Sequence, residues 1–463
     1  MVKQQAITTR SLHGLARWMV MSVLLLGLVT ACARREDAVA DLQQKNLLIE
    51  QLQLPAAGAE PQQLAQMTQA IKSRAESFKQ LVRTYPGSAR SAMLDARTLA
   101  ALRAQFPQLS KFLESEGSWS GDLVPVHFDN FDARVSVDGW MLHSMDGRAD
   151  LAPVDAALLR ALGKQAITVS GIRIGDVIAV ESALPRLDLP RAGRAKNYIA
   201  TSSAAAPGDC TTVGEQDFAV ILMGQPDSPA FPLGAMPVSF WQQQYFSTTP
   251  RSLNSFWHET SYGQASAAGQ VFGPYDFDQN YSCSDSGSIY NSALAAAKAA
   301  GADLSPYSRV SIVFAENSCW YGGLGEVGCG GADENIPHPY SVNWIPVSGT
   351  GSNAWDIPRV LFHESGHNLG LSHANTLDFG SIPLGAIDYT ATNPGTVTQP
   401  DTMAPDSAGG SAVNEEYADP YSAMDGSSNL HSYSAFAKVM QLGWIPFGDR
   451  REVTAAGSYV LAP

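Results

Sequence analysis

The stretch "HESGHNLGLSH", from His363 to His373, places three histidines and one glutamate within eleven positions. His363 and His367 are four residues apart, so on a helix both imidazoles project from the same face, about one turn apart. This is the spacing at which two imidazole nitrogens can share one zinc ion. The stretch therefore predicts a metal site built on a helix.

The flanking residues predict where this helix begins and ends. Asp356 is the expected N-cap, and Pro358 falls in the first turn, where its missing N–H is not needed. Gly370 is the expected stop, because glycine readily takes the left-handed conformation that ends a helix. The chain can then turn sharply and bring back His373 as a third ligand.

Glu364 adds a catalytic function to this metal site. Three protein ligands leave the fourth position of a zinc ion open for water, as a catalytic site needs and a structural one does not. Glu364 adjoins the first ligand and cannot easily bind the same ion, but it can reach the bound water. We expect it to act as general base and then to pass the proton to the leaving amine. A polar stripe on an ordinary helix is the alternative, and Gly370 and His373 argue against it.

The full pattern H-E-x-x-H-x-x-G-x-x-H resembles the zinc signature of the metzincin metallopeptidases, which carry a methionine turn further along the chain. Here "DPYSAMDG" supplies Met424, which the resemblance makes the floor of the site and not a ligand. Where astacins place a tyrosine ligand two residues after the methionine, this chain has Gly426. Further pieces resemble the gametolysin family over roughly residues 215–460: "SFWHETSYGQ" (255–264), "GLGEVG" (323–328), "YADPYSAMDG" (417–426) and "AKVMQLGWI" (437–445).

The resemblance implies a zinc-dependent endopeptidase with one catalytic Zn²⁺ ion, which hydrolyses peptide bonds of extracellular or cell-wall proteins. The implied fold is an α/β (α+β) metzincin-like catalytic domain, a twisted mixed sheet with a zinc-binding active-site helix. A protein or glycoprotein substrate would bind in extended form along an edge strand in or near "GLGEVG". The alternative is a catalytically silent surface lipoprotein that binds extended polypeptide, and Glu364 argues against it because such a protein needs no general base.

The pattern of apolar and polar residues changes several times along the chain. Apolar residues first recur every three to four positions, then short β-like runs follow, and finally strands alternate with helices. The expected order is a lipoprotein-type signal peptide (1–32), a helical pro-region (33–118), a small β-rich pro-domain (119–190), a linker (191–216), the catalytic domain (217–446) and the start of a C-terminal β unit cut short (447–463). The stretch "RAGRAK" (191–196) is where we expect activating cleavage.

The N-terminal residues predict export. A basic start is followed by the apolar run "WMVMSVLLLGLV" (18–29), which has the length of a signal peptide and is too short for a permanent membrane anchor. It ends in "VTAC", which resembles the lipobox of bacterial lipoproteins, so that Cys32 would carry a lipid anchor to the cell envelope, at the outer membrane or surface. Ordinary secretion is the alternative, because "ACA" also fits a signal-peptidase site.

The remaining cysteines are Cys210, Cys283, Cys319 and Cys329. Four cysteines in an exported chain predict two disulfides, with three connectivities open. We favour the local pair Cys319–Cys329, which leaves Cys210 with Cys283. As an alternative, Cys210 could be a free thiolate that blocks the zinc ion before activation.

Other features exclude some functions. The formal net charge of −14 argues against a nucleic-acid partner, and we expect a monomer. "DFDQNY" (276–281) begins like a calcium loop but lacks the glycine and glutamate of an EF-hand, so Ca²⁺ is only a secondary expectation. Five further histidines are assigned to the pro-region or to structural and exposed positions: His127 and His143 to the former, and His258, His338 and His431 to the latter.

Overall fold

The computed structural model describes residues 34–52, 61–186, 210–227, 236–315, 319–347, 357–378, 413–425, 430–449 and 457–458. Within these residues, no helix combines the length and hydropathy that a membrane span requires. The predicted signal peptide with Cys32, the "RAGRAK" stretch, Asp356 and Gly426 lie outside them. The described chain divides into two compact units, of which the first holds residues up to 117 with 152–154 and 171–181, and the second holds the rest.

The first unit is mainly helical. Residues 34–51 are helical, and they are followed by α2 (Pro61–Thr84), η1 (Pro86–Ser88), α3 (Ala89–Ala92), α4 (Ala96–Gln105) and η2 (Pro107–Phe112). Asp95 begins α4, because its side chain accepts hydrogen bonds from the N–H groups of Arg97 and Thr98. A buried ion pair of 2.6 Å between Arg74 and Glu114 lies within the apolar core of this unit.

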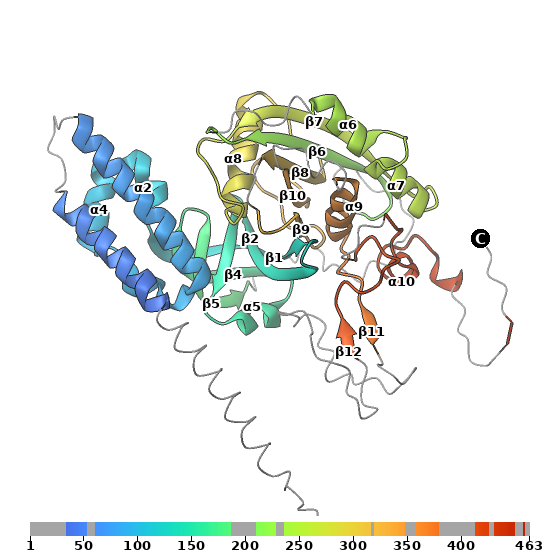
Figure 1. Ribbon diagram of the computed structural model, residues 1–463, viewed down its shortest axis with the longest axis horizontal. Helices are drawn as coiled ribbons and strands as arrows, with labels where there is room; N and C mark the ends of the chain where they lie inside the picture. Colours follow the sequence, from blue (N-terminus) through green and yellow to red (C-terminus); the bar gives the residue numbers. More distant parts are fainter. Residues whose placement is uncertain are drawn as a thin grey trace, which may run out of the picture. The chain divides into compact units, whose positions relative to one another are not determined.

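The second unit is built on a mixed sheet, which confirms the predicted mixed α/β class (Figure 1). The sheet order is β2-β3-β5-β4-β1-β9-β10-β8-β6-β7, and β2 also pairs with β1. The last four strands are parallel, whereas β9 is antiparallel to β10 and to β1, and β1 is antiparallel to β2. The bounds are β1 (Ser115–Asn130), β2 (Val135–Ser144), β3 (Gly147–Pro153), β4 (Ala166–Ile174), β5 (Val177–Pro185), β6 (Gly214–Gly224), β7 (Ala265–Asp276), β8 (Arg309–Ala315), β9 (Gly323–Glu326), β10 (Ser341–Val347), β11 (Thr376–Asp378) and β12 (Val413–Glu415).

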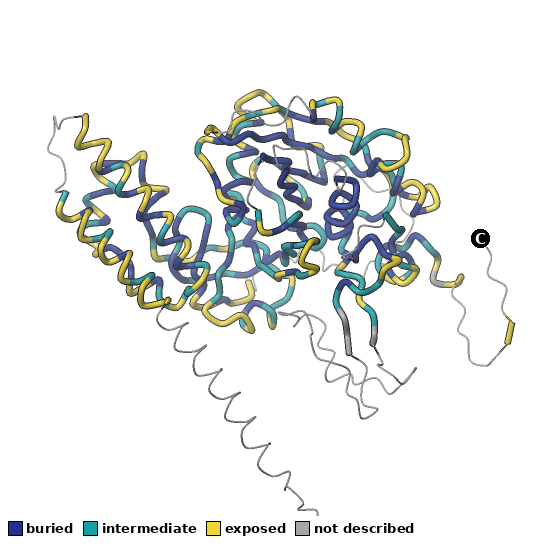
Figure 2. The backbone as a smooth tube through the Cα atoms, in the orientation of Figure 1, coloured by how far each residue is buried: buried dark blue, intermediate teal, exposed yellow. Residues whose placement is uncertain are grey.

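Helices cover both faces of this sheet. Alternate residues of β6 enter two different cores: Phe218, Val220 and Leu222 one, and Ala219, Ile221 and Met223 the other. The first core contains residues of α6 (Val238–Phe246), α7 (Leu253–Thr260) and α9 (Ile357–Asn368), and the second contains those of α8 (Ser286–Ala299). The central strands are therefore buried on both sides, as in parallel sheets generally (Figure 2). Three short helices complete the fold: α5 (Ala156–Leu162), α10 (Ala435–Met440) and η3 (Phe447–Asp449).

The strand β9 has a neighbour on each side. It pairs with β10, and on its other side β1 runs antiparallel to it, with Asp129 opposite Gly323 and Val126 opposite Glu326. In this structure "GLGEVG" is paired on both sides of its strand. One expectation is corrected here: residues 119–190 are not a compact domain of their own but are divided between the two units. The reason is that β1 completes its hydrogen bonds with a strand of the predicted catalytic domain.

The side chain of Glu326 stabilises the pairing of β1 with β9. It lies on the face of β9 that also carries Leu324. The Glu326 carboxylate is buried and accepts hydrogen bonds from Arg148 at 2.8 Å, from His143 at 2.6 Å and from the Val342 N–H at 2.8 Å. Burial raises the pKa of Glu326, but Arg148 and His143 outweigh it and lower the pKa from 4.5 to about 2. The carboxylate is therefore stabilised in its charged form, between strands β2, β3 and β9.

This lowered pKa predicts a loss of stability in acid. The contribution of Glu326 to stability is fully present above about pH 4.5 and is lost as the pH falls toward 2, because the unfolded chain then binds the proton more readily. The loss should be on the order of 3 kcal/mol. Urea unfolding at pH 7, 4.5 and 3 should show a steeper loss for the wild type than for Glu326→Gln. Parallel pH profiles would show that Glu326 carries no such stabilisation.

The disulfides differ from the predicted pairing. Cys210 is bonded to Cys329 (Cα–Cα 6.1 Å) and Cys283 to Cys319 (Cα–Cα 5.5 Å). The local pair Cys319–Cys329 was wrong, because Tyr321 donates a hydrogen bond to the carbonyl oxygen of Cys283 and so holds Cys319 beside that residue. The blocking-thiolate hypothesis for Cys210 is also wrong, because its sulfur is in a disulfide. Two disulfides are typical of proteins that fold in an oxidising compartment.

Candidate metal centre

Helix α9 carries two of the predicted ligands, and its ends lie as the sequence indicates. Pro358 occupies the first turn, and Gly370 has a φ of +95°, which confirms its place as the stop. The N–H of Leu371 then donates to the carbonyl oxygen of Gly366 at 3.1 Å, which closes the helix end. This turn returns the chain and brings His373 back toward the histidines of the helix.

The three predicted histidines meet around a fourth side chain, Asp129 of β1. One ligand atom from each of the four residues lies within 4.8 Å of all the others. The Nε2 atoms of His363 and His367 lie 3.5 and 3.1 Å from Asp129 Oδ2, and that of His373 lies 2.9 Å from Oδ1. All four side chains are almost completely buried. This group can hold a metal ion.

The hydrogen bonds of the histidines test whether the site fits a metal. Each Nδ1 faces an oxygen outside the group: His363 the carbonyl of Ala423 at 3.0 Å, His367 the carbonyl of Leu371 at 2.7 Å, and His373 the carboxylate of Glu416 at 2.6 Å. Because these oxygens accept, each Nδ1 donates, and Nε2 is the ring nitrogen left to bind a metal ion. The Nε2 atoms of all three histidines are buried and face the carboxylate of Asp129. Such ordered, inward-facing nitrogens are what a metal ion requires.

The electrostatics of the group also favour a cation. Burial lowers the pKa of His363 and lowers that of His367 to about 3, so both are neutral at pH 7. Burial opposes the charge of His373 too, but Asp129 and Glu416 raise its pKa to about 9. Burial raises the pKa of Asp129, yet the three histidines outweigh it and hold that pKa well below its usual range. A buried carboxylate among imidazoles is thus balanced by a proton on His373, which a metal cation can replace.

Glu364 lies beside this group, buried, and outside it. Neither of its carboxylate oxygens faces a hydrogen-bond donor among the described residues. Burial, the charge of Asp129 and a hydrogen bond shared with that carboxylate raise the pKa of Glu364 well above its usual range. A Cβ atom on Gly323 or Gly325 would collide with this carboxylate, so β9 needs glycine at the two positions that face α9. The glycines of "GLGEVG" therefore make room for Glu364.

Met424 packs against the backbone of α9. It is buried, and a Cβ atom on Gly366 would collide with its sulfur. The carbonyl oxygen of Met424 accepts a hydrogen bond from the N–H of Ala374 at 2.9 Å, directly after His373. Met424 thus contacts the helix at Gly366, between its two histidines.

Four residues near the site were not predicted as parts of it. Asp129 and His127 come from β1, and the His127 ring lies 4.8 Å from that of His367 and 4.6 Å from that of His373. Glu416 and Tyr417 come from the stretch before Met424, and the Tyr417 hydroxyl donates to Asp129. Glu416 and Tyr417 lie close to the methionine turn, so the sequence around that turn could have suggested them. Asp129 and His127 have no characteristic spacing from the three histidines that would have predicted them.

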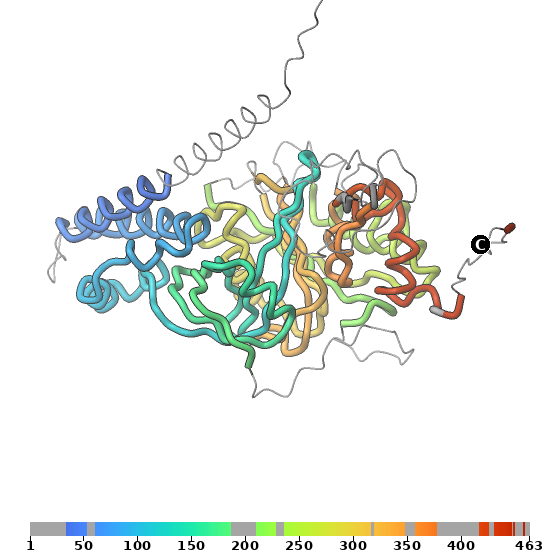
Figure 3. The backbone as a smooth tube through the Cα atoms, turned by 90° about the horizontal axis from the view of Figure 1, so that it is seen from below, coloured from blue at the N-terminus to red at the C-terminus, as the bar shows by residue number. Residues whose placement is uncertain are grey.

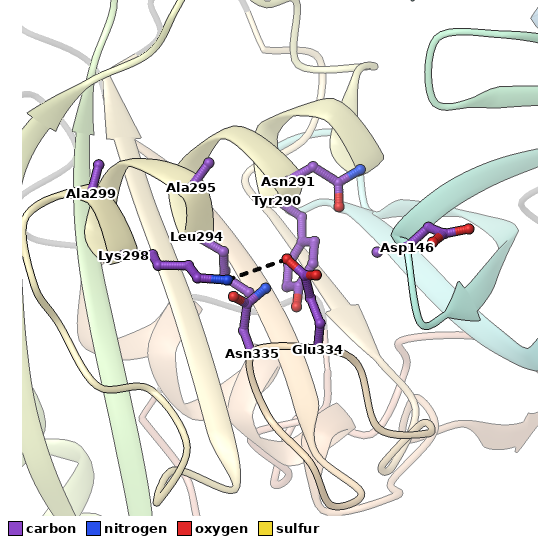
Figure 4. A pocket seen from close by; sticks show the side chains of 10 residues that line it. Asp146, Tyr290, Asn291, Leu294, Ala295, Lys298, Ala299, Glu334 and Asn335 are labelled. Atoms are coloured by element: carbon purple, nitrogen blue, oxygen red, sulfur yellow. Dashed lines mark hydrogen bonds and ion pairs between the residues drawn. The ribbon is translucent and has the colours of Figure 1, made fainter.

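The other sequence candidates lie elsewhere. His143 is buried beside Glu326, whereas His258 is exposed. In the described part of the chain, no second group of three His, Cys, Asp or Glu residues is arranged to hold a metal, so the calcium expectation gains no support there. A surface pocket of about 360 Å³ lies beside α8 and shares no residue with the metal group; Lys298 and Glu334 meet across it at 3.4 Å (Figure 4).

No protein-family model matches the sequence, and no curated protein matches it either. What the described residues define is a mixed α/β protein with a buried group of three histidines and one aspartate that can hold a metal ion. A buried glutamate that faces no hydrogen-bond donor stands next to that group.

The contact between Glu416 and His373 makes a testable prediction. Replacing Glu416 with glutamine should weaken metal binding by about 10- to 100-fold, because the carboxylate orients the imidazole and makes its other nitrogen a better ligand. Competition with a chromogenic chelator measures this affinity. Glu259→Gln, at an exposed position of α7, is the matched control and should bind metal like the wild type. An unchanged metal affinity in Glu416→Gln would show that Glu416 does not contribute to metal binding.

Proposed function

We propose that the protein is a zinc-dependent endopeptidase of metzincin type, with zinc held by His363, His367 and His373. Bound zinc would supply Lewis-acid polarisation of the scissile carbonyl and an acidified water. Glu364 takes the proton from that water and delivers it to the leaving amine. The observation that carries the proposal is the inward convergence of three ordered imidazoles next to a buried carboxylate that faces no hydrogen-bond donor.

The state of Glu364 supports catalysis over simple binding. Burying a carboxylate without hydrogen-bond donors costs free energy, and a protein that only binds polypeptide gains nothing from it. Burial and the charge of Asp129 raise its pKa, which makes Glu364 a stronger base toward a water proton than an exposed carboxylate. A catalytically silent surface lipoprotein is therefore the weaker proposal.

One observation favours a different function for the metal. With Asp129, the group offers four protein ligands, and four-coordinate sites without an open position are typical of structural zinc. In that case the ion would stabilise the fold, and Glu364 would have no reaction to serve. If Asp129 is a permanent ligand, the metal is structural. If Asp129 can be replaced by water, the metal can be catalytic.

The site also supports a proposal about substrate and location. An extended protein or glycoprotein chain would pair with β9, and we place the enzyme outside the cytoplasm, in keeping with its two disulfides. Attachment through a lipid on Cys32, and release by cleavage near "RAGRAK", complete the proposal. N-terminal sequencing of the active form tests the last step, and a start near Cys32 would refute it.

Hydrolysis of casein and of a peptide library by the purified protein tests the function itself. We expect cleavage that stops with a chelator and returns with one equivalent of zinc. The full chain is to be measured beside Asp129→Ala, since Asp129 occupies the site in the full chain. A folded Asp129→Ala protein that binds one zinc ion and cleaves nothing would contradict the peptidase.

A further inference from the structure

The strand β1 lies where an extended substrate would bind. It runs antiparallel along β9, with His127 opposite Gly325 and Asp129 opposite Gly323. In Figure 3 the teal segment that contains β1 runs beside the gold to orange part of the chain. Main-chain pairing of this kind is how an extended polypeptide adds to a sheet. While β1 is present, β9 has no free side on which another strand could pair.

The side chain of Asp129 reaches from this strand into the metal group. Its two oxygens lie between 2.9 and 3.5 Å from the three Nε2 atoms, and it is completely buried. Carboxylate oxygen is an ordinary zinc ligand, and with three imidazoles it completes the tetrahedral set. Asp129 therefore occupies the position that a catalytic site keeps open for water.

Further contacts hold β1 against all three histidines. Tyr417 donates its hydroxyl hydrogen to Asp129, and the His127 ring packs on those of His367 and His373. Phe131, the residue after β1, places its ring edge-on to His363 with 5.0 Å between centroids. On the other face of the sheet, the bonds from Arg148 and His143 to Glu326 fasten the neighbouring hairpin.

We propose that β1 is a built-in inhibitor: it binds along β9 as a substrate would, and Asp129 closes the metal centre as a fourth ligand until β1 is displaced. This inference rests on the proposed function. It replaces the free cysteine expected from the sequence with an aspartate as the blocking group. It also explains why a catalytic pattern of three histidines occurs beside a fourth protein ligand.

Ligand exchange at the metal tests the inference independently of peptidase activity. The full chain is loaded with one equivalent of Co²⁺, and its visible absorption is followed during titration with acetohydroxamate, a small chelating anion. We expect no spectral change in the wild type, and a saturable change in Asp129→Ala, where a water-occupied position becomes available. Asp132→Ala, at an exposed position just after β1, is the matched control and should behave like the wild type.

The outcomes separate the inhibitor from the peptidase. Acetohydroxamate binding to the wild type as tight as to Asp129→Ala would overturn the inhibitor. If both Asp129→Ala and the isosteric Asp129→Asn lose the metal, Asp129 is a permanent structural ligand and the inference is also overturned. If the variants bind acetohydroxamate but cleave no casein, Asp129 does close the site and the peptidase proposal fails. If the wild type cleaves casein as fast as the variants, the peptidase stands without the inhibitor.

Discussion

Replacing Glu364 with glutamine is expected to lower kcat/KM for peptide hydrolysis by about a thousandfold or more, since a positioned general base contributes on the order of 10² to 10⁴. Glutamine has nearly the same shape, so the three histidines should keep their places, but its amide cannot accept the proton of the attacking water. The effect is to be measured in the Asp129→Ala background, in which the fourth metal position is open.

The same substitution should leave the protein equally stable or make it more stable. The Glu364 carboxylate is buried without a hydrogen-bond donor, and a neutral amide is less costly to bury there. We expect the free energy of unfolding to stay constant or to rise by about 1 kcal/mol. Loss of activity with retained stability is typical of a catalytic group that is poorly suited to its folded environment.

Glu259→Gln provides the control for this prediction, because it makes the same chemical change at an exposed position of α7. It should alter neither activity nor stability. Activity in Glu364→Gln within tenfold of its parent would show that Glu364 is not the general base.

Withdrawal of the metal is the second large effect that we expect. An ion that binds only the folded chain stabilises it by about 4 kcal/mol when present at a thousand times its dissociation constant. A chelator should therefore lower the midpoint of urea unfolding of the full chain by a corresponding amount. The loss should be large because the ion neutralises the buried carboxylate of Asp129, which otherwise depends on a proton held by His373.

His367→Asn tests whether the stabilisation by metal comes from this site. Without one of its imidazoles the group should bind zinc far more weakly, and the chelator should then change the unfolding midpoint little. His258→Asn, on the exposed side of α7, should respond to the chelator like the wild type. Identical unfolding of the wild type with and without chelator, at confirmed loss of metal, would contradict a stabilising metal at this site.

The part of the site that depends on local spacing could be predicted from the sequence. The interval between His363 and His367 is one helical turn, and Gly370 is positioned to end that helix. Three of the four side chains of the metal group follow from these intervals alone. Periodicity likewise predicted a mixed sheet with helices, because strands buried on both faces differ in pattern from amphipathic helices.

The remaining features depend on partners that are distant in the chain. Asp129 reaches the histidines only because β1 pairs with β9. Pairing between strands that are distant in the chain has no characteristic residue spacing, so the sequence does not predict it. The prediction of the disulfide connectivity failed for the same reason, since the same four cysteines allow three pairings. Residues 119–190 show strands in their sequence, but not that one of those strands belongs to the sheet of the metal site.

The central claim is that the histidine group is the catalytic centre of a zinc peptidase. The most direct measurement compares casein hydrolysis by full-length Asp129→Ala, loaded with one equivalent of zinc, with that by Asp129→Ala/Glu364→Gln loaded in the same way. We predict cleavage by the first protein and a loss of about a thousandfold or more in the second. Two folded proteins that each hold one zinc ion and cleave nothing, or that cleave equally well, would contradict the claim.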